Sequence, residues 1–89
     1  MRMSLYAIEK VMRYSEEARD QLIRNLEWVK GSVIGETSQL KETAADQCLK
    51  ELELFDTYVK NLAADLEHIN ELMRTHKKFI EEMNSQGGF

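Results

Sequence analysis

The sequence contains no proline and only one cysteine in 89 residues, and only four of its residues are glycine. Proline and glycine form most of the turns of β-proteins, so their scarcity argues against all-β and α/β folds. Gly87 and Gly88 lie at the C-terminus and only Gly31 and Gly35 are interior, which confines breaks within the chain to one place. A single, soluble, nearly all-helical domain is therefore predicted.

The sequence also lacks the long apolar segments of membrane and secreted proteins. No stretch approaches the ~20 apolar residues of a membrane span, and the N-terminus has no apolar segment of signal-peptide length. The chain is therefore expected in the cytoplasm without membrane insertion, and export would need a route without a cleaved signal peptide. The lone Cys48 is expected to be a small buried residue, with an intermolecular disulfide as the alternative.

The charge balance gives little sign of nucleic-acid binding. Sixteen acidic and twelve basic residues leave a net charge of −4, and no run of five like charges occurs. A basic cluster lies close to the end of a predicted helix, where cations complement the helix dipole. Its members are Arg74, His76, Lys77 and Lys78. Nucleic acid is therefore not expected as a partner.

The first helix is predicted at residues 2–30, where apolar residues recur at steps of three and four. These residues are Leu5, Ile8, Val11, Met12, Ala18, Leu22, Leu26 and Val29. Gly31 and Gly35 follow, and serine and threonine then precede the next apolar pattern, as in residues that cap helices. The sequence therefore predicts a hairpin turn at about residues 31–37, with Trp28 beside it.

The second half carries a heptad pattern of the kind found at the seam of coiled coils. Its members are Cys48, Leu52, Phe55, Val59, Leu62, Leu66, Ile69, Met73, His76, Ile80 and Met83. Additional apolar residues widen the stripe, which is typical of helices with neighbours on more than one side. The pattern predicts a helix at about residues 38–84 and a disordered tail at 85–89. The expected fold is an all-α, two-helix antiparallel hairpin with a long second helix.

The unequal helix lengths predict an interface. At 1.5 Å per residue the helices span roughly 42 and 70 Å, so the first helix, folded back, ends near residue 65 of the second. Apolar residues around and beyond that point are expected to bind another chain and complete a four-helix bundle. They are Leu62, Leu66, Ile69, Met73, His76, Phe79, Ile80 and Met83. The alternative is a break near residues 43–47 and a third helix that folds back.

The sequence offers few groups for chemistry, and neither catalytic residues nor a cofactor is predicted. Two helices supply a groove rather than the pocket that a catalytic triad requires. Asp65 and His68 have the spacing of a carboxylate and imidazole in di-iron bundles, but only one such pair exists, so no metal site is predicted. His76 lies on the heptad pattern, where protonation of a buried imidazole would weaken a dimer, or it is a partly exposed residue near a helix end.

The residues around the expected turn resemble those of WXG or Esx-type helical hairpins of type VII secretion, and in particular the small partners encoded beside LXG toxins. Trp28-Val-Lys-Gly31 ends the first helix, and the segment from Val33 to Leu40 leads into the second. The family motif is Trp-x-Gly, whereas two residues separate Trp28 from Gly31 here. The family's Tyr-x-x-x-Asp/Glu secretion signal is absent, which favours a protein that accompanies an effector over one exported alone.

The resemblance implies a non-enzymatic protein that binds the helical N-terminal domain of an LXG-type toxin and acts as its chaperone or targeting factor. The partner would then cover the apolar end of the second helix. Trp28 would either pack against the second helix or be offered to the partner. The alternative is an intracellular coiled-coil homodimer that serves as an adaptor or regulator, so homo- and heterodimers both stay open.

Overall fold

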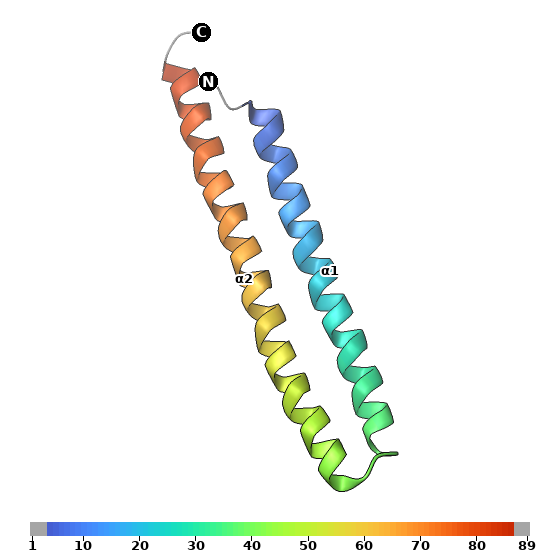
Figure 1. Ribbon diagram of the computed structural model, residues 1–89. Helices are drawn as coiled ribbons and strands as arrows, with labels where there is room; N and C mark the ends of the chain where they lie inside the picture. Colours follow the sequence, from blue (N-terminus) through green and yellow to red (C-terminus); the bar gives the residue numbers. More distant parts are fainter. Residues whose placement is uncertain (1–3, 87–89) are drawn as a thin grey trace.

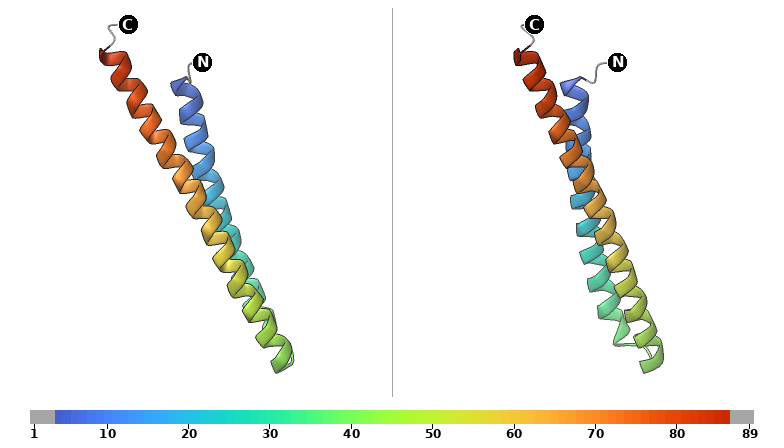
Figure 2. Two further views of the ribbon diagram at one scale, coloured as in Figure 1. Left: turned by 60° about the vertical axis from the view of Figure 1, so that its left-hand side comes forward. Right: turned by 90° about the vertical axis from the view of Figure 1, so that its left-hand side faces the viewer.

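The computed structural model describes residues 4–86, which form two antiparallel helices joined by a short turn (Figure 1). Helix α1 spans Leu5–Thr37 and helix α2 spans Glu42–Gln86. The molecule is a rod of 71 × 17 × 15 Å. The helices wind around each other, because in the right-hand view of Figure 2 α1 lies on opposite sides of α2 near the termini and near the turn. The predicted all-α hairpin with a longer second helix is confirmed.

The turn lies at residues 38–41 and not at 31–37, so the prediction from the glycines was wrong. Gly31 and Gly35 are inside α1, and neither has the left-handed φ that favours glycine at a helix end. Hydroxyl groups end the helix instead: Thr37 Oγ1 donates to the carbonyl of Ile34 at 2.8 Å, and Ser38 Oγ donates to that of Gly35 at 3.2 Å. In the turn that follows, the N–H of Gln39 donates a hydrogen bond to the carbonyl of Glu36 at 3.0 Å.

The other predicted boundaries also shift by a few residues. Ser4 caps α1, because its Oγ accepts a hydrogen bond from the N–H of Ala7 at 3.0 Å, so the helix begins at Leu5 rather than at residue 2. Helix α2 is continuous through residues 43–47, which excludes the alternative with a third helix. It also continues to Gln86, so residues 85 and 86 of the predicted tail are helical. Residues 1–3 and 87–89 lie outside the described part of the chain.

The two helices meet along one seam of buried and half-buried residues at steps of three and four, the spacing of a coiled coil. On α1 the seam consists of Leu5, Ile8, Met12, Ser15, Arg19, Leu22, Leu26, Val29 and Val33. On α2 it consists of Leu52, Asp56, Val59, Ala63, Leu66, Asn70, Met73, Lys77 and Ile80. Ile8 and Leu26 are the most deeply buried of these side chains.

This seam corrects half of the predicted heptad pattern. Leu52, Leu66 and Ile80 lie on it as predicted, together with Val59 and Met73. The residues predicted to alternate with them are exposed instead: Cys48, Phe55, Leu62, Ile69, His76 and Met83. The α2 seam positions in their place are Asp56, Ala63, Asn70 and Lys77, which are polar or small. The prediction chose the more hydrophobic row. The charged residues Asp56 and Lys77 can lie on the seam because Lys30 and Glu9 of α1 neutralise them.

Four polar contacts between the helices define their register. The residue numbers of each pair have the same sum: Glu9 with Lys77, Glu16 with Asn70, Arg19 with Glu67, and Lys30 with Asp56. Helix α1 therefore lies beside α2 well past residue 65, where it was predicted to end. The predicted overhang of residues 66–83 was wrong because α1 continues seven residues beyond Lys30 and moves the point at which the chain folds back.

Replacing both interior glycines with alanine tests the position of the turn. A Cβ at Gly31 or Gly35 would meet nothing within 4 Å, and alanine is better than glycine in a helix by about 1 kcal/mol. We therefore expect Gly31→Ala and Gly35→Ala each to raise the midpoint of thermal unfolding by several degrees, measured by circular dichroism. A lower midpoint in either variant would contradict a helix through these positions.

Candidate interaction surface

One flank of the seam, here called the charged side, carries the polar contacts between the helices. Lys77 Nζ lies 3.1 Å from Glu9 Oε1, and Lys30 Nζ lies 3.0 Å from Asp56 Oδ1. Arg19 Nη1 donates to Glu67 Oε1 at 2.9 Å, and Asn70 Nδ2 donates to Glu16 Oε1 at 3.1 Å. In each pair a residue of one helix's seam meets a residue just outside the seam of the other. The charged side therefore carries all four of these contacts between α1 and α2.

Asp56 is the carboxylate with the most partners on the charged side. Its Oδ1 is shielded from solvent and lies beside Lys30, while its Oδ2 lies 3.1 Å from Nζ of Lys60 one turn further along α2. These contacts with Lys30 and then Lys60 hold the pKa of Asp56 below its usual value. The same contact with Asp56 raises the pKa of Lys30.

The opposite flank of the seam contains no lysine, arginine, aspartate or glutamate in its first row on either helix. On α1 that row consists of Val11, Ala18, Asn25 and Ser32, with the cap residue Ser4 before them. On α2 it consists of Cys48, Phe55, Leu62, Ile69, His76 and Met83. Because the charged rows of both helices meet on one side of this antiparallel pair, these two rows share the other side. Exposed aromatic and aliphatic residues lie next to them.

We name this surface the apolar face. It consists of Val11, Tyr14 and Trp28 of α1 and of Phe55, Tyr58, Leu62, Ile69, Leu72, Phe79 and Met83 of α2. Every one of these side chains is at least 36% exposed, and Trp28 is 73% exposed. Scattered single apolar residues are normal at a protein surface, whereas exposed apolar residues gathered on one face are typical of interaction surfaces.

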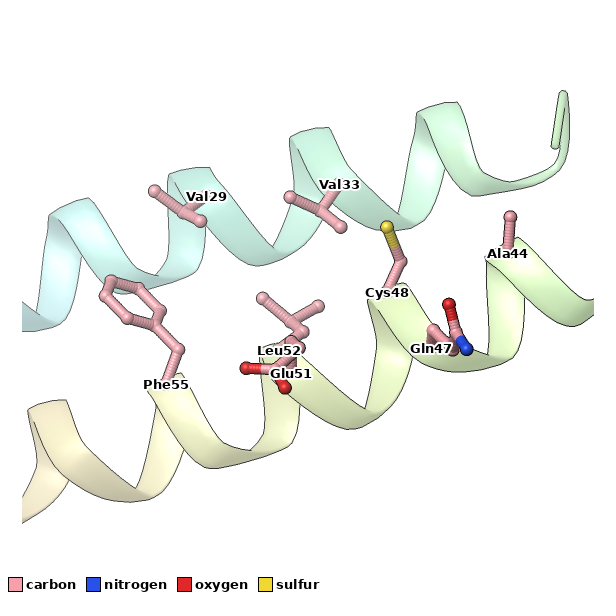
Figure 3. A pocket seen from close by; sticks show the side chains of 8 residues that line it. All are labelled: Val29, Val33, Ala44, Gln47, Cys48, Glu51, Leu52 and Phe55. Atoms are coloured by element: carbon pink, nitrogen blue, oxygen red, sulfur yellow. The ribbon is translucent and has the colours of Figure 1, made fainter.

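A groove between the helices extends the apolar face toward the turn (Figure 3). Val29 and Val33 of α1 form one wall, and Cys48, Leu52 and Phe55 of α2 form the other. Figure 3 shows the Cys48 thiol and the Phe55 ring pointing toward α1 across this groove. Cys48 is exposed, so the expectation of a buried cysteine was wrong.

The structure divides the predicted interface residues into two groups. Leu66, Met73 and Ile80 are half-buried on the seam with α1. The others remain exposed on or beside the apolar face: Leu62, Ile69, His76, Phe79 and Met83. The surface extends further than predicted, because Phe55 and Tyr58 lie on it well before residue 62.

The residues predicted to form the turn have other positions. Trp28 lies more than two turns before the end of α1 and faces solvent, so it does not close the core of the hairpin.

Asp65 and His68 are both exposed on α2, and residues 4–86 contain no group of three or more potential metal ligands. Neither α1 nor α2 has an apolar segment sufficient to cross a membrane.

Sequence reasoning missed the polar members of the seam. Asn70 is 5% exposed and Asp56 is half-buried, although both were expected on the solvated face or given no role. The available signal was their spacing: Asp56, Ala63, Asn70 and Lys77 recur every seven residues and alternate with the apolar row that begins at Leu52. This spacing was overlooked because three of the four residues are polar, and a polar residue is rarely buried unless it has a hydrogen-bond partner.

We expect the stabilisation from Asp56 to depend on pH. A lowered pKa in the folded state means that the ionised carboxylate stabilises the fold above its ordinary pKa of about 3.9 and that this contribution is lost as the pH falls below that value. Urea unfolding of the wild type and of Asp56→Asn should therefore differ at pH 7 and converge near pH 2. A difference of equal size at both pH values would contradict this role of the charge.

Leu66 and Ile69 are separated by less than one turn of α2, and we expect opposite effects from their replacement by aspartate. Leu66→Asp places a carboxylate in the seam against α1 and should lower the free energy of unfolding by about 1–3 kcal/mol. Ile69→Asp changes a side chain that is 41% exposed and should alter stability far less. Urea unfolding of both variants measures this. Equal destabilisation would contradict the assigned seam.

No protein-family model, curated protein or solved structure matches this chain. The resemblance to WXG-type hairpins therefore stays a prediction that rests on the residues around Trp28.

Proposed function

We propose that this chain is a non-enzymatic partner protein that packs its apolar face against helices of another protein. Following the resemblance to type VII secretion hairpins, the partner is the helical N-terminal domain of an LXG-type toxin. The chain would bind this domain in the cytoplasm and act as its chaperone or targeting factor. The observation that supports this proposal is the apolar face, which runs along most of the rod while the polar contacts between the helices lie on the opposite side.

The size of the apolar face supports a protein partner. Tyr14, Phe55, Tyr58 and Phe79 are between 42% and 63% exposed. An aromatic side chain has about 150–250 Å² of surface, so these four rings alone expose roughly 400 Å². Leu62, Ile69, Leu72 and Met83 extend the patch toward the roughly 800 Å² that each partner buries in a standard interface.

The shape of the face also supports helical partners. Its residues on α2 follow steps of three and four, as in Phe55, Tyr58, Leu62 and then Ile69, Leu72. A second helix laid along this row can insert its own apolar side chains between them, as in helix-in-groove binding. With one helix over each of α1 and α2, the assembly would be a four-helix bundle.

A homodimer is the second candidate, because a second copy also presents two helices with a matching apolar face. In that case the chain would be an intracellular coiled-coil adaptor or regulator. Light scattering on the purified chain distinguishes the two candidates, since a homodimer has twice the mass of one chain in the absence of any toxin domain.

Co-expression with the N-terminal helical domain of an LXG-type toxin tests the proposal. We expect a stable complex in size-exclusion chromatography, and we expect Ile69→Asp combined with Leu72→Asp to abolish it, because charges buried in an apolar interface are strongly unfavourable. Ala64→Asp is the control for an added carboxylate, since Ala64 is exposed on another face of α2.

Two results would count against the proposal. One is a toxin domain that does not bind although both proteins are folded by circular dichroism. The other is a complex that survives the double substitution on the apolar face but is lost in Ala64→Asp.

A further inference from the structure

The charges that border the apolar face are of one sign along α2. Glu51 and Asp65 are exposed in the same outer row as Tyr58, Leu72 and Phe79. The next row outward, from Gln47 to Glu82, adds one more carboxylate and no lysine or arginine. The lysines and arginines of this part of α2 all lie elsewhere: Lys77 pairs with Glu9 on the seam, and Lys60 pairs with Asp56 on the charged side.

Glu51 and Asp65 also have no ion-pair partner among residues 4–86, unlike Asp56 and Glu67. They are fourteen positions apart, which places them on the same line of the helix at a distance of roughly 21 Å. A helix that covers Phe55, Leu62 and Ile69 would therefore pass beside both carboxylates.

The geometry points to a partner helix that combines an apolar stripe with lysine or arginine residues about two heptads apart. The stripe packs on the apolar face of α2, and the basic residues pair with Glu51 and Asp65. This inference rests on the proposed docking role of the apolar face and adds the charge of the partner. A second copy is the poorer occupant, because the two rows of this face nearest the seam contain no lysine or arginine on either helix, and Lys10 and Arg24 lie one row further out on α1.

Two synthetic amphipathic helical peptides of about four heptads test the charge of the partner. Both carry the same leucine stripe, and at two positions fourteen residues apart one carries lysine and the other glutamate. An exposed ion pair changes a binding constant by up to roughly fivefold. The lysine peptide is attracted to the two carboxylates and the glutamate peptide is repelled by them, so the difference between the two binding constants is larger than for one pair. We therefore expect the full chain to bind the lysine peptide about tenfold or more tightly than the glutamate peptide at low salt, measured by fluorescence anisotropy.

Charge reversal on the protein supplies the matched test. Glu51→Lys combined with Asp65→Lys should reverse the preference, so that the glutamate peptide binds more tightly. Glu53→Lys combined with Glu81→Lys is the control, because both residues are exposed on the charged side and the change in net charge is the same. The control should keep the preference of the wild type, and high salt should reduce that preference by screening.

The outcomes separate this inference from the proposed function. Equal binding of both peptides, lost in Ile69→Asp, would overturn the assigned charge while the apolar face remained a docking surface. Binding of neither peptide would count against the face as a docking surface and so against both. A stable dimer of the free chain that Ile69→Asp converts to monomer would show that a second copy occupies the face, which would overturn a basic partner.

Discussion

Two helices share a single line of contact, and the rest of this structure depends on that constraint. Each helix buries one stripe against the other, and few apolar side chains of residues 4–86 are buried: Ile8, Leu26, Leu52, Val59 and Ala63. A helix with a second apolar stripe has no place for it in a two-helix molecule. Helix α2 has such a stripe, in which Phe55, Ile69 and Phe79 are exposed. The apolar face is the direct result of placing a helix with two stripes in a hairpin with one seam.

The seam includes several polar residues, and they explain how the two faces become different. Asp56 and Lys77 each meet an opposite charge just outside the seam of α1, which compensates for their partial burial. Asn70 Nδ2 donates to Glu16 there, while Asn70 Oδ1 is buried without a partner among residues 4–86. These contacts all lie on the charged side of the seam. The row of large apolar residues on α2 lies on the opposite side of the seam, away from these charged contacts.

The periodicity of the sequence predicted two helices of unequal length and a helix contact every seven residues, because helix geometry alone determines that spacing. The turn was misplaced because glycine permits a left-handed conformation without requiring it, and Val29 and Val33 on the seam keep α1 helical past Gly31. The contact row was half wrong for a related reason. Cys48, Phe55 and Leu62 are more apolar than Asp56 and Ala63, and only the pairing with α1 shows which row is inside.

The shared register of the four interhelical contacts has a consequence for the entropy of binding. Sliding α1 by one turn would move every contact by about 5.4 Å and break all of them together, so intermediate positions are not stabilised. These contacts therefore favour one arrangement of the two helices that carry the apolar face. A rigid template loses little conformational freedom on association, and the entropic penalty of complex formation falls mainly on the segment that lies down along it.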